Sequence, residues 1–265
     1  MRYATWNVNS LKARLPLVER WVSVVQPDVL CLQETKLADE AFPTEFFAEL
    51  GYESARHGNG PWNGVAIVSR VGLADVVAGF PDDLPGSSPE ARLIRAKCGS
   101  VVVICVYVPN GRTVGSEHYE AKLEFLGRLV TYVASTSPAT AEVLLCGDFN
   151  VAPADADVFD PAYFEGSTHV TAAERDAVGK LVDLGFEDTI RRQYPDTGGI
   201  FSWWDYRAGN FHKGRGMRID LMLASRPLAS RVEWALIDRN GRRGQGSKTE
   251  PQPSDHTPVI VQTAE

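Results

Sequence analysis

The sequence predicts an α/β protein in which helices cover β-sheets. Three features indicate this class: short apolar runs typical of buried strands, stretches with apolar residues at helical spacing between several of them, and Gly and Pro clusters that separate these segments. The 265 residues are 44% apolar and 23% charged, which is a globular composition. Because no linker, repeat or low-complexity tract interrupts the pattern, we expect a single domain spanning residues 1–265.

The expected elements follow one another along the whole chain. An initial strand ends near Trp6, and residues 17–25 repeat apolar side chains at helical spacing until Pro27 closes the helix. Helical spacing returns in residues 119–133 and in residues 172–184, where Gly185 is expected as the C-cap. Further apolar runs predict buried strands at residues 29–32, 65–68, 101–108, 143–146, 221–224 and 259–261. Breaker residues predict loops at residues 80–89, 135–138, 209–216 and 240–253.

The apolar runs and the cysteines indicate where in the cell the protein is expected. No run reaches the roughly 20 apolar residues of a membrane span, and the first residues lack the apolar core of a signal peptide. We therefore expect a soluble, cytoplasmic protein with no membrane partner. The cysteines have no paired spacing, so we expect buried thiols rather than a zinc site or disulfides. They are Cys31, Cys98, Cys105 and Cys146.

The charge of the chain is distributed unevenly. A net charge of −7 argues against binding to a polyanion if the charge is spread evenly over the surface. Basic residues nevertheless concentrate late in the chain, where they could form a basic face or be solvated loop charges, and charge alone leaves both open. They include Arg191, Arg192, Arg207, Lys213, Arg215, Arg218, Arg239, Arg242, Arg243 and Lys248.

Polar side chains stand at the ends of six expected strands. They are Asn7, Glu34, Tyr107, Asp148 with Asn150, Asp220, and Asp255 with His256. In a layered α/β fold such ends can converge on one rim. Carboxylate and amide oxygens with a single histidine are the hard ligands that Mg²⁺ prefers. Together these groups could supply the cation site, the oriented water and the leaving-group stabiliser that phosphodiester hydrolysis requires.

Taken singly, most of these residues have a structural explanation. Glu34 could begin a helix, Tyr107 could pack in the core, and Asn150 could form a turn. Asp220 is different, because an unpaired carboxylate inside a strand is costly, and pairing with His256 would remove that cost. The Asp220 position therefore favours a functional site.

Several motifs occur in a specific order and spacing between Trp6 and His256. They cover residues 6–10, 32–36, 90–92, 107–111, 147–153, 201–207, 216–220 and 254–256. In these motifs the chain resembles the exonuclease III family of abasic-site endonucleases, part of the wider endonuclease, exonuclease and phosphatase fold. The resemblance implies a four-layered α/β sandwich of two packed mixed β-sheets flanked by helices. It also implies Mg²⁺ as the cofactor, with Mn²⁺ able to substitute.

The resemblance assigns roles to the strand-end residues. Glu34 would be the main metal ligand, with Asn7, Asp148, Asn150, Asp255 and His256 in or around the coordination shell. Tyr107 would contact the scissile phosphate, and Asn150 would hydrogen-bond it and stabilise the transition state. Asp148 would orient or deprotonate the water or protonate the leaving oxygen, while His256, held in one tautomer by Asp220, would bind phosphate or act as the base.

The resemblance further implies a duplex DNA partner with abasic sites, nicks or blocked 3′ ends, bound by a monomer. The baseless sugar would enter a small apolar pocket, here at the positions of Trp203, Met217 and Ile219. Met217 stands where many relatives carry tryptophan, and Gly214 stands where asparagine is common. The DNA-binding residues implied are Arg92, Tyr107, Asn110, Trp203, Arg207, Met217, Arg218, Ile219 and His256.

Two other functions compete with DNA repair. A phosphatase or phosphodiesterase of the same fold could act on inositol phosphates or lipids with a similar metal core. The aromatic and arginine-rich residues 201–218 favour DNA, because they suit a backbone and an extruded sugar, although they could instead be a core cluster with solvated arginines. A non-catalytic DNA-binding module is disfavoured because the chain keeps the carboxylates and the histidine.

Overall fold

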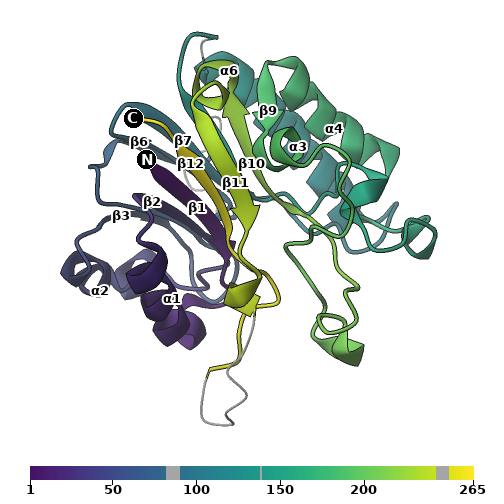
Figure 1. The fold of residues 1–265 in the computed structure, drawn as a ribbon, viewed down its shortest axis with the longest axis horizontal. Coiled ribbons are helices and arrows are strands. Elements are labelled where there is room, and N and C mark those ends of the chain that lie inside the picture. The colour runs from purple at the N-terminus through teal and green to yellow at the C-terminus, as the bar shows by residue number, and fades with distance from the viewer. Residues whose placement is uncertain (82–89, 138, 243–250) are drawn as a thin grey trace.

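The computed structural model describes residues 1–81, 90–137, 139–242 and 251–265. Two six-stranded sheets pack face to face, and helices cover their outer faces (Figure 1). The first sheet has the order β11-β12-β1-β2-β4-β3, with bounds Val232–Ile237, Val259–Thr263, Arg2–Asn7, Val29–Gln33, Val65–Ser69 and Glu53–His57. The second has the order β5-β6-β7-β8-β10-β9, with bounds Ala74–Ala78, Leu93–Cys98, Val101–Tyr107, Val143–Asp148, Asp220–Ser225 and Phe186–Asp188.

Helices form the two outer layers, so the predicted four-layered sandwich is confirmed. Helices α1 (Leu11–Val25) and α2 (Thr44–Glu49) pack on the first sheet, while α3 (Glu117–Thr136) and α4 (Ala172–Asp183) pack on the second (Figure 1). The remaining short helices are α5 (Thr189–Gln193), α6 (Arg226–Ala229), η1 (Asp39–Ala41), η2 (Asp155–Asp157), η3 (Ala162–Phe164), η4 (Arg207–Gly209) and η5 (Arg239–Arg242).

The core lies in three apolar layers. Side chains of both sheets form the central layer, and a further layer lies between each sheet and its helices. All four cysteines are buried free thiols, as predicted. Small and β-branched residues dominate between the sheets, where interdigitating side chains have to fill a narrow space. The sheets are therefore a rigid base for the residues at their ends.

Strand pairing brings the predicted polar residues to one edge. Strands β1 and β2 are parallel, and so are β7 and β8. Strand β12 runs antiparallel to β1, and β10 runs antiparallel to β8 with Asp220 opposite Asp148. The carboxyl ends of β1, β2, β7 and β8 therefore share an edge with the amino ends of β10 and β12. The termini lie together away from this edge, where the Met1 ammonium donates to the Thr263 carbonyl at 2.8 Å (Figure 1).

Helix α1 begins earlier than the sequence predicts. The expected start at Leu17 follows Pro16, yet the helix starts at Leu11 and contains Pro16. Backbone bonds from Ser10 and Leu11 to the carbonyls of Glu34 and Thr35 hold the first turn in place. Tertiary contacts thus offset the hydrogen bond that proline removes.

Other differences concern weakly patterned segments. Strands β3, β5, β6, β9 and β11 were not expected. A charged residue interrupts the apolar residues of β5 and of β11, and most side chains of β5 are solvent-exposed. The predicted loop at 135–138 starts too early, since α3 continues to Thr136. Residues 82–89, 138 and 243–250 of the predicted loops, with Arg243 and Lys248, lie outside the described residues. No helix in the described ranges is long and apolar enough to span a membrane.

Candidate active site

Glu34 follows β2 in an unusual backbone conformation. Its φ is +50°, a left-handed value that is uncommon for glutamate and typical of strained functional positions. The next residue, Thr35, donates its backbone N–H to the Gly64 carbonyl at 3.1 Å. A Cβ at position 64 would lie 2.2 Å from the Thr35 hydroxyl, so only glycine fits there. The Lys36 ammonium lies 2.9 Å from the Glu34 carboxylate.

Asn7 joins the two central carboxylates. Its amide nitrogen donates to Glu34 Oε1 at 2.8 Å and to Asp148 Oδ2 at 2.9 Å. Its amide oxygen accepts the backbone N–H of Asn9 at 3.0 Å. The predicted ligand Asn7 is therefore within the site. In this orientation its amide nitrogen positions the two carboxylates, and its oxygen is not directed at a metal ion.

Asp148 and Asn150 form a compact turn after β8. The Asn150 backbone N–H donates to Asp148 Oδ1 at 2.9 Å, and its side-chain amide donates to the Val108 carbonyl at 2.9 Å. The Asn150 oxygen accepts from Asn110 at 3.2 Å, so it is engaged by protein rather than placed among the acidic groups. Asn150 also has a φ of +50°, which asparagine tolerates better than most residues.

His256 lies between two carboxylates. Its Nδ1 is 2.9 Å from Asp220 Oδ2, and its Nε2 is 3.7 Å from Asp148 Oδ2. This is the pairing predicted for Asp220, which is fully buried. The ring is further held through its backbone N–H, which donates to Ser254 Oγ at 3.2 Å. The Ser254 hydroxyl in turn donates to the Asn7 carbonyl at 2.7 Å.

The pKa values of these groups are strongly shifted. Burial raises the pKa of Asp148 to about 7, although His256 and hydrogen bonds from Asn7 and Asn150 oppose the rise. Burial alone would lower the pKa of His256, but the Asp220 and Asp148 carboxylates outweigh it and raise the value to about 10. At neutral pH the imidazole is thus a cation, and Asp148 can exchange a proton.

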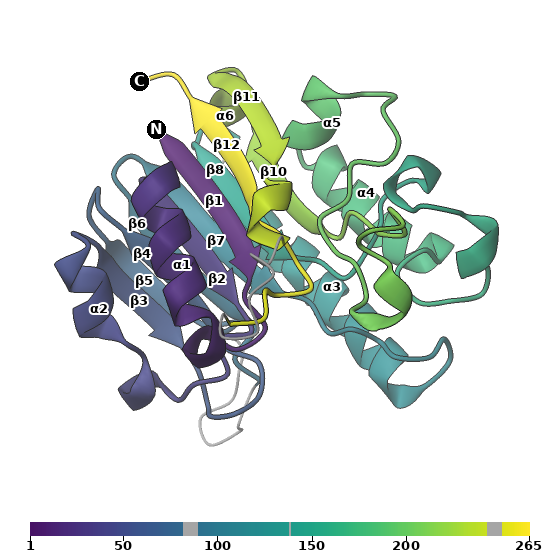
Figure 2. The same ribbon diagram turned by 60° about the horizontal axis from the view of Figure 1, so that its bottom comes forward.

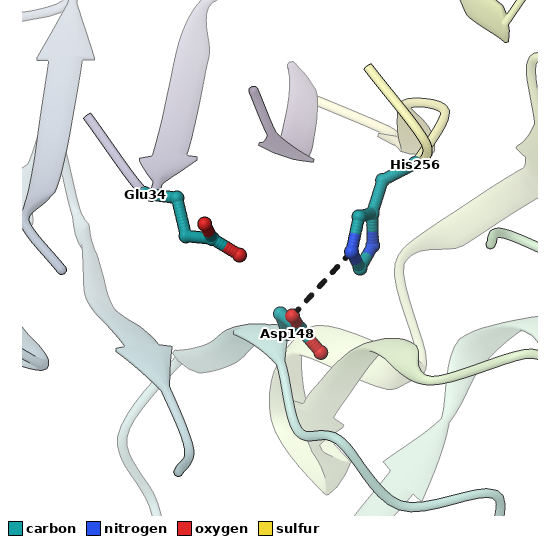
Figure 3. A group of neighbouring side chains, drawn as sticks. All are labelled: Glu34, Asp148 and His256. Carbon is teal, nitrogen blue, oxygen red and sulfur yellow. Dashed lines mark ion pairs between the residues drawn. The ribbon is translucent and has the colours of Figure 1, made fainter. Parts of the chain in front are cut away.

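Glu34, Asp148 and His256 lie close enough to hold a metal ion, with His256 as a ligand only when its ring is neutral. One ligand atom from each lies within 4.8 Å of the others, and Figure 3 shows the three side chains pointing into a common space. Glu34 is only partly buried, so an ion there could keep water ligands, as Mg²⁺ usually does. The donor chemistry therefore fits a hard divalent cation.

Tyr107 and Arg92 form the neighbouring wall of the site. The Arg92 guanidinium stacks 4.6 Å from the centroid of the Tyr107 ring and donates to the Tyr107 carbonyl at 3.3 Å. Burial raises the pKa of the Tyr107 phenol, and the charges of Glu34 and Asp148 raise it further. The phenol consequently stays protonated and can donate a hydrogen bond to an anion. Both residues border an open cavity of about 400 Å³, together with Asn110.

Asp255 lies beside the acidic group rather than in it. Its carboxylate accepts from Asn9 at 3.0 Å and from the Trp203 indole N–H at 3.1 Å. Trp203 contacts an apolar cluster that contains the predicted pocket residues Met217 and Ile219, each 2% exposed. The proposed sugar-binding residues therefore adjoin the site through the Trp203–Asp255 contact.

The DNA-binding role predicted for Arg218 is wrong. Its side chain is fully buried, with Nε 2.6 Å from Asp157 and Nη1 2.7 Å from Asp188. A guanidinium held inside the protein by two carboxylates cannot reach a DNA backbone. Arg207, by contrast, is 91% exposed in its side chain, although it lies outside the catalytic cluster.

A buried polar group behind Asn150 was missed by sequence reasoning. Lys122 on α3 and Glu174 on α4 form an ion pair at 2.5 Å, and both side chains are fully buried. Lys122 Nζ also donates to the Asn150 carbonyl at 2.6 Å, and His169 Nδ1 lies 2.5 Å from the same oxygen. The one signal in the sequence was a lysine on the otherwise apolar face of the helix predicted at residues 119–133.

Comparisons with known proteins agree with this geometry. The sequence matches the Endonuclease/Exonuclease/phosphatase family over residues 4–256. It is 33% identical to exodeoxyribonuclease III of Haemophilus influenzae over 98% of both chains. The fold is similar to an AP endonuclease from Archaeoglobus fulgidus (36% identity, TM-score 0.93) and to a 3′-5′ exonuclease from Neisseria meningitidis (35% identity, TM-score 0.94), each over 100% of both chains. The acidic site lies within the matched residues, and the chain belongs to the Endonuclease/Exonuclease/phosphatase family, in the exodeoxyribonuclease III branch, and is a hydrolytic nuclease.

Proposed function

We propose that the chain is a Mg²⁺-dependent DNA-repair phosphodiesterase that hydrolyses duplex DNA 5′ of abasic sites and trims blocked 3′ ends. The observation that carries this proposal is the meeting of Glu34, Asp148 and His256 around one space at the rim of both sheets. The similar AP endonuclease and 3′-5′ exonuclease structures support both activities.

The residues of the site can divide the work of phosphodiester hydrolysis. Glu34 would be the main ligand of the cation, which supplies neutralisation of the charge that grows on the phosphate. The protonated His256 and the Tyr107 phenol would bind phosphate oxygens by donating hydrogen bonds. Asn150 keeps its amide beside Asp148, where it can contact the same phosphate.

Asp148 is better suited than His256 to act as the base. A general base works best with a pKa near the working pH, and burial places the pKa of Asp148 at about 7. The carboxylates of Asp220 and Asp148 keep His256 protonated, so the imidazole has no free lone pair to accept a proton. Asp148 would take the proton of the attacking water and could return it to the leaving 3′ oxygen.

A side-by-side assay tests the substrate class. Duplexes with one abasic site, a nick or a 3′-phosphate are compared with an inositol phosphate, each with Mg²⁺, with Mn²⁺ and with chelator. We expect cleavage of the DNA substrates that stops with chelator, with Mn²⁺ replacing Mg²⁺, and no release of phosphate from inositol phosphate. Faster turnover of the inositol phosphate would reject the DNA-repair assignment, and metal-independent cleavage would reject the cation site.

A further inference from the structure

An open cavity of about 810 Å³ lies beside the catalytic rim. One wall is the loop around η4, with Tyr206, Phe211 and His212, and the other is η5, with Arg239 and Arg242. Pro253, three positions before His256, also lines it. The η4 loop and the chain that leads into β12 lie at the same end of the molecule in both ribbon views (Figures 1 and 2).

Aromatic rings hold the two arginines of η5 in place. The Arg242 guanidinium lies 5.0 Å from the centroid of the Tyr206 ring and 5.3 Å from that of Phe211. The Arg239 guanidinium lies 5.3 Å from the same Phe211 centroid and 5.2 Å from Trp204. Two positive groups therefore flank a single phenylalanine. Stacking leaves the N–H groups at the edges of each guanidinium free to meet an anion.

Arg242 is buried and forms no ion pair with a carboxylate of the described residues. It is only 9% exposed, and its Nε has no hydrogen-bond partner. No carboxylate among the described residues forms an ion pair with Arg239 or Arg242, and Asp205 in the cavity wall is engaged by Arg207. Burial lowers the pKa of Arg242 more than Tyr206 and Asp255 raise it. A buried cation without an ion-pair partner is costly, and because the described residues supply none, this part of the cavity suits an anion.

Three other late arginines make the contrast clear. Arg191 and Arg218 pair with Asp157, and Arg192 pairs with Glu187 at 2.5 Å. These cations serve the fold. The arginines of η5 instead face an open cavity, so part of the late basic cluster remains available to a ligand.

The cavity is rigidly attached to the active site. The Tyr206 hydroxyl donates to the Pro253 carbonyl at 2.9 Å, and the Trp204 backbone N–H donates to the Asp255 carbonyl at 3.0 Å. On the other wall, a Cβ at Gly241 would lie 2.3 Å from Pro258, so η5 packs directly against the residues after His256. A group bound in the cavity would be fixed relative to the reacting phosphate.

We propose that Arg239 and Arg242 bind a backbone phosphate of the DNA outside the position that is cut. The proposal rests on the DNA substrate argued above and adds a second anchoring point to it. A guanidinium group can donate two parallel hydrogen bonds to the oxygens of one phosphate. Each such contact displaces condensed counterions from DNA. A nucleotide fits within the cavity, since pockets of this size commonly hold small ligands.

The test measures DNA affinity without turnover. Wild type, Arg239→Met and Arg242→Met bind duplexes that contain one tetrahydrofuran abasic analogue, in chelator and at several salt concentrations. Arg239 is exposed, so its variant serves if Arg242→Met does not fold. Lys97→Met is the matched control, because Lys97 is exposed at the end of β6 that lies away from the catalytic edge.

We expect each arginine variant to bind about tenfold more weakly and to lower the salt dependence by about one counterion, with Lys97→Met unchanged. Shortening the duplex one nucleotide at a time from each end should give a step loss of wild-type affinity that the arginine variants lack. Equal losses for all proteins at every length would overturn the proposal. So would a wild-type response to inorganic phosphate, followed by tryptophan fluorescence, without any length step. If the wild type bound no DNA at all, both this proposal and the proposed DNA-repair function would be rejected.

Discussion

The buried ammonium group of Lys122 donates a hydrogen bond of 2.6 Å to the backbone carbonyl of Asn150. The same group contacts the carbonyl of Asn110 at 3.3 Å and pairs with Glu174 at 2.5 Å. Both asparagines lie in the turns that carry the site, and Asn150 has a left-handed backbone. Lys122 therefore ties the two turns together behind the site, in addition to the bonds from Asn110 to the Asn150 side chain and from that side chain to the Val108 carbonyl.

Replacing Lys122 tests whether this contact positions Asn150. Lys122→Met leaves Glu174 buried and unpaired, so we expect a loss of about 3–5 kcal/mol in the free energy of unfolding. The double variant Lys122→Met/Glu174→Gln should recover most stability, because it removes both charges. Its kcat should stay at least about tenfold below wild type, since Asn150 has lost its anchor. Recovery of stability and kcat together in urea titrations and DNA-cleavage assays would make the pair purely structural.

Asp148→Asn tests the proposed base. The substitution removes the proton acceptor and nearly preserves the shape of the side chain, and one amide oxygen can still accept the Asn150 backbone N–H. We therefore expect kcat to fall by at least about 100-fold with similar DNA affinity. Asp75→Asn, at an exposed position in β5, is the matched carboxyl-to-amide control and should leave kcat unchanged. Turnover within tenfold of wild type would remove Asp148 from proton transfer.

The sequence predicted the site residues that are recognisable from their immediate neighbours in the chain. Asp148 and His256 stand beside apolar strands, so strand ends alone indicated that they share a rim. Arg218 looked like a DNA contact because its partners, Asp157 and Asp188, are remote in the chain, and no local pattern reveals such a pairing. Lys122 was missed for the same reason. Strand β5 was missed because Asp75 interrupts its apolar residues and most of its side chains are exposed.

Met217→Ala tests the apolar pocket next to the site. Met217 packs with Ile219 and Val158, so truncation should leave a cavity and lower the free energy of unfolding by about 2–5 kcal/mol. If these residues surround an extruded sugar, kcat/KM should fall more for an abasic duplex than for a 3′-phosphate end. Val178→Ala, in the layer under α4, controls for general loss of stability. Equal losses of kcat/KM on both substrates would show that this apolar cluster does not recognise the sugar.

His169 should make stability depend on pH. Burial of its ring, aided by the charge of Lys122, lowers its pKa to about 4 from an ordinary 6.5, although Asn150 and Glu174 oppose the shift. Because the folded state binds this proton less readily than the unfolded state, the stabilisation is complete above pH 6.5 and is lost as the pH falls towards 4. In urea titrations between pH 4 and 7, His169→Gln should show a shallower fall in unfolding free energy than wild type. Parallel curves would mean that His169 titrates normally.

Arg218→Met tests the correction to the predicted DNA contacts. Removing the guanidinium leaves Asp157 buried, with Arg191 as its remaining cation, and takes from Asp188 its partner at 2.7 Å. We expect the free energy of unfolding to fall by about 3–5 kcal/mol, as measured in urea. The salt dependence of DNA binding should match wild type at a temperature where the variant is folded, because a buried arginine displaces no counterions from DNA. Arg207→Met is the exposed counterpart and should leave stability within about 0.5 kcal/mol. A reduced salt slope with unchanged stability in Arg218→Met would return this residue to the DNA interface and require that its ion pairs open on binding.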